Sequence, residues 1–399
     1  MLTKLKHSLY FALVRVLTRF APPLSYVVFA GAGSARQLCS HIARSGARRV
    51  LVVTDKPLRE LGIADRAVQG LVDAGVELAW YDGVEPDPTF AQVAEGIATL
   101  RATGADTVLA VGGGSSIDAA KVIAAGGGSD EDPRNWIGLG KVKHDVFPLY
   151  AIPTTAGTGS EATMGAVISD SENHEKGVIS GAGLLPSAAA LDSDLMLGLP
   201  PAITAATGID ALTHAIEAYI SIWDRGTRTE CSRRAVKLVF DHLRTAYSDG
   251  QNRDARDGMS MAAYYAGMAI NQVNVGSVHA IAHQLGGKYG IPHGYANALV
   301  LPHVLEYCRE EAGPRLAELA QLIGVAEDGQ TQAEQTLAFI DAVRQLRSDV
   351  GIAETSDKVR AEDFDYLVDL AVAEGGGYLV PKLLDRHNTR AILAKIAAN

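Results

Sequence analysis

Cysteine is scarce in this 399-residue chain, and Cys39, Cys231 and Cys308 show no CxxC or other paired spacing. Their pattern excludes a zinc–thiolate site and a disulfide framework, and it is typical of a reducing cytoplasm. An excess of positive charge is also absent, because 36 Lys and Arg stand against 46 Asp and Glu, for a formal net charge of −10. A protein that follows a nucleic-acid backbone needs a basic face, so we expect no nucleic-acid partner.

Long apolar runs are missing too, and no stretch of the sequence is suited to span a bilayer. Residues 1–20 repeat apolar side chains at helical steps: Leu2, Leu5, Leu9, Leu13, Val16 and Phe20. Arg15 interrupts the unbroken apolar stretch that a secretory signal needs. We interpret residues 1–25 as an amphipathic helical extension that packs on its own protein or on a partner subunit of a homo-oligomer. Contact with a membrane surface is the less favoured alternative, supported by four basic residues: Lys4, Lys6, Arg15 and Arg19.

Between residues 26 and 200, short β-branched runs alternate with helical stretches. Such a pattern implies a parallel sheet that is covered by helices on both faces. The predicted strands cover residues 50–54, 76–81, 107–111 and 149–152, with a marginal one at residues 26–30.

After Pro200 and Pro201 the pattern becomes helical throughout. The predicted helices cover residues 202–222, 228–246, 254–273, 277–288, 297–324, 332–350 and 362–373. We therefore predict an α/β nucleotide-type domain over residues 26–200, followed by an all-helical domain over residues 201–399.

Two loops rich in glycine or hydroxyl groups follow predicted strands. The first, Gly112 to Ser115, opens a helix that also carries Asp118 and Lys121. Glycines at a helix N-terminus let a phosphate approach the backbone N–H groups, although a tight strand-to-helix turn is the simpler alternative. The second loop, Thr154 to Glu161, follows the fourth predicted strand. Loops at the carboxyl ends of parallel strands line one crevice, so we predict a dinucleotide site there.

Two further features bear on the choice of cofactor. Asp55 comes directly after a strand, where a carboxylate can accept both hydroxyls of an adenosine ribose and repel a 2′-phosphate, which favours NAD over NADP. The same residue is also a suitable helix N-cap. Residues 31–36 resemble a dinucleotide fingerprint without its third glycine, and we interpret them as a structural turn.

The helical half places histidines at regular spacing. Asp210 and His214 lie four residues apart, as do His279 and His283, and His293 follows Pro292. A spacing of four puts two side chains on one helix face. Burying so many polar groups is costly without a partner, so we predict a shared metal ion. The spacing does not distinguish His279 from His283 as a ligand, and nitrogen and oxygen donors suit Fe(II) and Zn(II) alike.

Read together, four segments resemble the iron-containing alcohol dehydrogenase family, which includes lactaldehyde reductase and butanol dehydrogenases. They are Gly112–Lys121, Pro153–Glu161, Pro200–Tyr219 and Val278–Pro302, and the similarity runs from about residue 27 to residue 350. The resemblance implies a Rossmann-like N-terminal domain and a helical, metal-binding C-terminal domain. It also implies NAD as cofactor, with Fe(II) as the favoured metal and Zn(II) as the alternative.

Carried over residue by residue, the resemblance implies that the metal ligands are Asp210, His214, His279 and His293. His283 then matches a non-ligand histidine beside the substrate and the nicotinamide. The implied cofactor contacts are Asp55, Gly113, Gly114, Ser115, Asp118, Thr154, Thr155, Thr158 and Lys176. Family members often carry an Asn-Pro-Arg element near the C-terminus, and this chain has residues 375–382 without it.

The resemblance implies an NAD-dependent enzyme that transfers hydride between a small alcohol held at the metal and nicotinamide, or reduces the aldehyde in reverse. His283 would relay the hydroxyl proton. Two alternatives belong to other classes. A dehydroquinate-synthase-like lyase would need clustered lysines and arginines, which residues 208–300 offer sparsely. A nucleotide-binding scaffold would leave the histidines unexplained.

Overall fold

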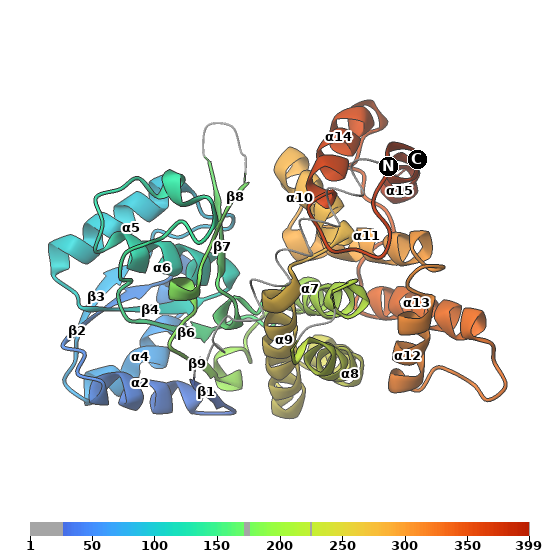
Figure 1. Ribbon diagram of the computed structural model, residues 1–399. Helices are drawn as coiled ribbons and strands as arrows, with labels where there is room; N and C mark the ends of the chain where they lie inside the picture. The colour runs from blue at the N-terminus through green and yellow to red at the C-terminus, as the bar shows by residue number, and fades with distance from the viewer. Residues whose placement is uncertain (1–26, 171–175, 224–225, 399) are drawn as a thin grey trace.

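The computed structural model describes residues 27–170, 176–223 and 226–398, so the predicted N-terminal helix lies outside the described residues. Figure 1 shows that the chain first alternates strands with helices and then continues as helices alone. Among the described residues, no helix is both long enough and apolar enough to cross a membrane.

Six parallel strands form the main sheet, in the order β1-β9-β6-β4-β2-β3. Parallel neighbours need crossover connections, which here run through helices or through a second, smaller sheet and return the chain to the same end of the main sheet. The predicted parallel sheet is therefore confirmed. Its strands are β1 (Val27–Ala30), β2 (Arg49–Val53), β3 (Glu77–Tyr81), β4 (Thr107–Gly112), β6 (Leu149–Pro153) and β9 (Ala188–Leu191).

Both faces of this sheet are buried, which explains the continuous apolar run in β2. Leu51 and Val53 pack in the core beneath α5 and α6, whereas Val50 and Val52 pack on the opposite side with α2 and α4 (Figure 1). Successive side chains of a strand point to opposite faces, so each face demands apolar residues. The helices of this half are α2 (Ser34–Arg44), α3 (Lys56–Glu60), α4 (Ile63–Asp73), α5 (Phe90–Thr103) and α6 (Gly114–Gly126).

Four strands were not predicted from the sequence. Three form a small sheet in the order β5-β8-β7, with bounds Gly138–Leu139, Lys176–Ser180 and Gly165–Ser169. The fourth is β9, whose residues are three alanines and a leucine, a composition with little β propensity. Its backbone pairs with β1 and β6, so tertiary packing decides its conformation.

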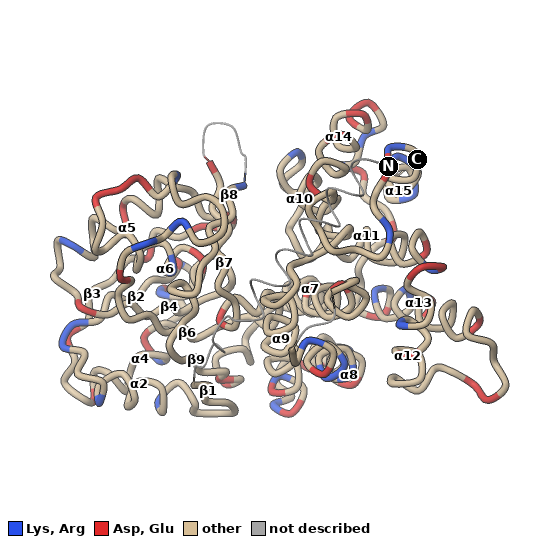
Figure 2. Tube along the Cα trace, viewed as in Figure 1, with Lys and Arg blue, Asp and Glu red and all other residues tan. Residues whose placement is uncertain are grey.

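Helix α7 (Pro201–Ile220) lies at the centre of the helical half and packs against α8, α9 and α11. Nearly every residue from Thr204 to Ile220 is buried, and Figure 2 shows the helix mostly tan beside the charged α8. The remaining helices are α8 (Arg228–Ser248), α9 (Arg253–Val273), α10 (Ser277–Tyr289), α11 (His293–Tyr307), α12 (Gly313–Ile323), α13 (Gln332–Asp349), α14 (Phe364–Gly375) and α15 (Arg386–Ile396).

The helix predicted over residues 297–324 is wrong in its extent. The structure has two helices there, because α11 ends at Tyr307 and α12 starts at Gly313 with Pro314 in its first turn. Proline favours the start of a helix and disrupts its interior, so Pro314 was the signal for the break. Helix α15 was not predicted. The change from strands to helices falls between β9 and α7, and we propose residue 200 as the domain boundary.

The two halves meet where glycine residues let two backbones touch. Gly159, in the loop after β6, adopts a φ of +62°, and it lies against Gly267 of α9. A Cβ atom built on Gly267 would lie 2.3 Å from the carbonyl oxygen of Gly159. The same loop approaches α7, because a Cβ atom on Gly157 would lie 2.6 Å from the Cβ atom of Thr207.

We predict that Gly267→Ala lowers the free energy of unfolding by about 1–3 kcal/mol, since the added methyl group must displace a backbone carbonyl. Chemical denaturation of the variant measures this loss. Gly287→Ala in α10 is the matched control, because its Cβ atom would have no heavy atom within 4 Å. Equal stability of the two variants would contradict the close approach.

Candidate metal centre

Three helices supply the predicted metal ligands. Asp210 and His214 lie one turn apart on the buried α7, and His279 lies in the first turn of α10. His293 is the first residue of α11, where Pro292 serves as the N-cap and directs the chain into the helix. The side chains of Asp210, His214 and His279 are almost fully buried, and that of His293 is partly exposed.

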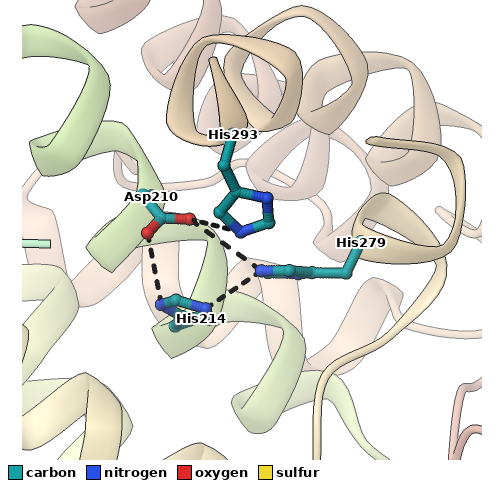
Figure 3. Close-up of side chains that lie close together, drawn as sticks. All are labelled: Asp210, His214, His279 and His293. Atoms are coloured by element: carbon teal, nitrogen blue, oxygen red, sulfur yellow. Dashed lines mark hydrogen bonds and ion pairs between the residues drawn. The ribbon is translucent and has the colours of Figure 1, made fainter. Parts of the chain in front are cut away.

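The four side chains converge on one point (Figure 3). One ligand atom from each lies within 4.8 Å of the other three. The Nε2 atoms of His214 and His279 are 2.9 Å apart, and the Nε2 atom of His293 lies 3.5 Å from Oδ1 of Asp210. Ligands about 2.0–2.2 Å from one ion are separated by such distances.

Burial sets the protonation state of this cluster. It lowers the pKa of His279 well below the usual 6.5, with a further lowering from the neighbouring His214, His293 and His283. Burial likewise lowers the pKa of His293 to about 4, although Asp210 opposes the change. The imidazoles of His279 and His293 are therefore neutral at neutral pH, which is the form that binds a metal.

The donor set fits a divalent transition metal. Three imidazole nitrogens and one carboxylate oxygen are ligands that both Fe(II) and Zn(II) accept. Asn297, buried on α11, contacts the same atoms, since its Nδ2 atom lies 2.7 Å from Oδ1 of Asp210 and 3.1 Å from Nε2 of His279. Packing so many polar atoms together without solvent is costly, and a bound cation would relieve that cost.

The predicted cofactor residues follow the carboxyl ends of three adjacent strands. Asp55 follows β2, Gly113 follows β4 and Thr154 follows β6. The chain reverses its direction across the sheet between β2 and β4, which is where open α/β sheets bind ligands. Helix α6 starts at Gly114, and its N-cap Gly113 offers no side-chain oxygen to the free N–H groups of the first turn.

The two predicted loops touch each other. A Cβ atom on Gly114 would lie 2.6 Å from Cγ2 of Thr158, and one on Gly113 would lie 3.3 Å from Oγ1 of Thr155. Glycine is therefore needed at position 114 for this close approach, whereas a Cβ atom at position 113 would require only a small shift of Thr155. Ser115 is the second residue of α6, so it lies beside this contact.

Three other predicted contacts already bond to protein groups. Asp55 caps α3 by accepting the N–H of Leu58 at 2.9 Å, as the alternative reading anticipated. Asp118 accepts the N–H of Val167 at 2.9 Å and the hydroxyl proton of Ser160, and so ties α6 to the segment after β6. Lys176 forms an ion pair with Asp87 at 2.6 Å.

Residues 31–36 form a turn that is closed by the protein itself. Gly31 and Gly33 adopt φ angles of +94° and +78°, a region that favours glycine. The carboxylate of Asp192 accepts the N–H groups of Gly33 at 3.1 Å and Ala35 at 3.0 Å. The start of α2 is thus occupied by a side chain, in agreement with the interpretation as a structural turn.

His283 stands beside the cluster. Its ring packs against those of His279 and His293, with centroid separations of 5.7 and 5.3 Å. The Nδ1 atom lies 2.6 Å from Oε1 of Glu374, which also accepts the hydroxyl proton of Tyr378. The geometry thus separates two histidines that spacing alone left equivalent.

Sequence reasoning missed the residues that hold these histidines. Glu217 contacts His279, Glu374 contacts His283 and Asn297 contacts Asp210. Glu217 had a local signal, because it lies seven residues after Asp210 and so shares its helix face. Glu374 had none, since 91 residues separate it from His283.

A parallel α/β sheet joined to a helical bundle with a buried Asp–His cluster suits an enzyme that combines a nucleotide with a divalent metal. The chain belongs to the iron-containing alcohol dehydrogenase family. The model of iron-containing alcohol dehydrogenase matches residues 26–193, and the model of the family's C-terminal part matches residues 204–397.

Relatives of known activity match most of the chain. A 1,3-propanediol dehydrogenase from Klebsiella pneumoniae is 38% identical over 87% of this chain and 91% of its own length. Lactaldehyde reductase from Escherichia coli is 37% identical over 88% and 92%. An NAD-dependent methanol dehydrogenase from Bacillus methanolicus is 35% identical over 87% and 91%. A crystal structure of 1,3-propanediol oxidoreductase superposes with a TM-score of 0.90 at 37% identity, covering 94% of this chain and 100% of the other.

These comparisons confirm the family and the reaction class that the sequence motifs predicted. The protein is an oxidoreductase of the iron-type alcohol dehydrogenases, and the predicted cofactors, NAD and iron, agree with this membership. The lyase and scaffold alternatives receive no support, because the relatives named above are dehydrogenases and reductases.

The pKa values predict a pH-dependent stability in the metal-free protein. In the unfolded chain a histidine takes up a proton near pH 6.5, whereas folded His293 resists protonation until about pH 4. The unfolded state therefore binds more protons between these values, and the melting temperature should fall as the pH drops from 6.5 to 4. Thermal melts of chelator-treated protein measure this. The melting temperature of His293→Gln should fall less over the same pH range. A pH dependence equal to that of the wild type would contradict the lowered pKa of His293.

Proposed function

We propose that this chain interconverts a small alcohol and its aldehyde, using NAD and a divalent metal held by Asp210, His214, His279 and His293. One observation carries the proposal: three imidazole nitrogens and one carboxylate oxygen from three helices converge within 4.8 Å in a largely buried place. Iron(II) is the metal that the family description favours, and zinc(II) suits the same donors.

When bound, a divalent cation stabilises the alkoxide form of an alcohol or polarises an aldehyde, and NAD accepts or returns the hydride. The protein orients these partners. Asp210 and His214 belong to a helix that is packed on all sides, so they cannot move apart to suit other geometries. The partly exposed His293 marks the side from which a substrate would approach.

We assign the dinucleotide to the carboxyl edge of β2, β4 and β6. Asp55 would accept the ribose hydroxyls, and the N-terminus of α6 would hold the pyrophosphate with the hydroxyl-bearing loop after β6. Because its oxygens already accept bonds within the protein, Asp118 would act by holding α6 and that loop together. Beside Asp118 in this supporting role, the proposed contacts are Asp55, Gly113, Gly114, Ser115, Thr154, Thr155, Thr158 and Lys176.

His283 is the proposed proton-transfer residue. Glu374 engages its Nδ1 atom at 2.6 Å, which leaves Nε2 as the nitrogen that can exchange a proton with the substrate hydroxyl. Gln284 donates to the other oxygen of Glu374 at 2.6 Å, so the carboxylate is held from two sides. Tyr378, in the segment that lacks the Asn-Pro-Arg element, adds a third bond to Glu374.

We further propose a cytoplasmic homo-oligomer. All three cysteines are free and buried, which is the usage expected in a reducing compartment. Light scattering of the purified chain, which has a mass of 42.0 kDa, would give the number of subunits.

The first prediction of this assignment concerns cofactor choice. Asp55→Asn should lower the preference for NAD over NADP, measured as the ratio of kcat/KM values, by about 10-fold, or ~1.4 kcal/mol, because it removes a charge that repels the 2′-phosphate. Asparagine still caps a helix, so α3 should be retained. Glu60→Gln, at the far end of α3, is the control. A ratio unchanged by Asp55→Asn would remove Asp55 from the cofactor site.

The second prediction separates ligands from the neighbouring histidine. His279→Ala and His293→Ala should lose bound metal, whereas His283→Ala should retain it and lose about 10²–10⁴-fold in rate. Metal analysis of anaerobically purified protein, coupled to NADH absorbance over a panel of alcohols and aldehydes, measures both properties. If His283→Ala is purified without metal while His279→Ala retains it, the two roles must be exchanged. Wild-type protein that oxidises no alcohol and reduces no aldehyde would refute the proposed function.

A further inference from the structure

Glu217 lies outside the predicted ligand set, yet it is buried beside it. It sits on α7, seven residues after Asp210 and three after His214, so the three side chains share one helix face. Only 5% of the residue is exposed. A carboxylate in such surroundings needs partners, and its bonding pattern shows what it does.

Two backbone N–H groups and one histidine ring nitrogen at the start of another helix meet this carboxyl group. Gly276 donates its backbone N–H at 2.8 Å and Val278 at 2.6 Å, and both belong to the start of α10. The Nδ1 atom of His279 lies 2.6 Å from Oε2 of Glu217. The N-cap of α10 is a glycine without a side-chain oxygen, so Glu217 supplies the cap from α7.

The bond to Nδ1 decides which nitrogen of His279 can bind a metal. A neutral imidazole has one N–H and one lone pair. When Glu217 is ionised it can only accept a hydrogen bond, so the ring proton is on Nδ1 and the lone pair is on Nε2, the atom that lies 2.9 Å from Nε2 of His214. The opposite tautomer would point an N–H into the cluster and could not act as a ligand there.

We propose that Glu217 is a positioning residue of the metal centre. Its carboxylate selects the tautomer and ring orientation of His279, and it fastens the first turn of α10 to α7. The inference rests on the ligand set of the proposed function. Hydrogen-bonded carboxylates behind a ligating histidine are general devices for raising metal affinity.

Glycine at position 276 leaves the space that the Glu217 carboxylate occupies at the start of α10. A Cβ atom there would lie 2.8 Å from Oε1 and 3.0 Å from Cδ of Glu217. Any larger residue would push the carboxylate away from the helix start. The φ of Gly276 is −138°, so its backbone conformation is open to other residues and close approach is the reason for glycine.

Glu217→Gln tests the inference, because the amide keeps the size of the side chain but turns one acceptor into a donor facing an N–H group. We expect zinc affinity, measured by competition with a chelator, to fall about 10–100-fold. Glu318→Gln is the matched control. Glu318 accepts a hydrogen bond from Tyr219, which lies on α7 as Glu217 does, but among the described residues it contacts none of the proposed metal ligands. The control substitution should leave the affinity unchanged.

A spectroscopic readout separates positioning from general stability. Cobalt(II) absorption at saturating metal reports the ligand field directly, and its bands should shift in Glu217→Gln but not in Glu318→Gln. If Glu217→Gln does not fold, Gly276→Ala carries the same test, with Gly287→Ala of the same helix as its control. Gly276→Ala should also weaken zinc binding and shift the cobalt bands.

Failure of the Glu217 proposal can be told apart from failure of the proposed metal site. Wild-type affinity and unchanged cobalt bands in the folded variants would overturn the role of Glu217 alone. Wild-type protein that binds neither zinc nor cobalt would instead overturn the ligand set itself.

Discussion

The cost of burying lone-pair atoms next to one another governs the helical half of this protein. Asp210, His214 and His279 are nearly inaccessible to water, and their ligand atoms crowd within a few ångströms of one another. Such a cluster is unfavourable by itself, because no donor among them satisfies all the acceptors. A divalent cation would resolve the conflict, and α7, α10 and α11 pack around the place where we propose that one binds.

The α/β half and the helical half meet at a fixed place. The loops after β4 and β6 carry the residues assigned to the dinucleotide, and the second loop lies directly on α7 and α9. Gly157 and Gly159 permit this contact because any side chain would collide with the helices. Hydride transfer needs nicotinamide and substrate side by side, and this close contact would hold the two proposed sites together.

The segment without the Asn-Pro-Arg element remains part of the site. Tyr378 bonds to Glu374 behind His283, and the carbonyl oxygen of Leu379 accepts the N–H of Ile222 beyond the end of α7. Lys382 bonds to the carbonyl oxygen of Tyr307 and pairs with Glu311. These contacts join the segment after α14 to the end of α7 and to the end of α11.

Local patterns in the sequence determined the parallel sheet, most of the helices and the shared face of Asp210 and His214, because strand alternation and helical periodicity are local properties. The strand β9 and the break after Tyr307 escaped this reasoning, since an alanine run and a long apolar stretch are ambiguous without their neighbours. Spacing did not distinguish His279 from His283, and the family resemblance implied the choice before the tertiary structure showed their different surroundings. Both lie on one face of α10, and only the approach of Glu217 from α7 and Glu374 from α14 gives them different partners. Contacts between residues 62 and 91 positions apart follow from packing, which no local pattern records.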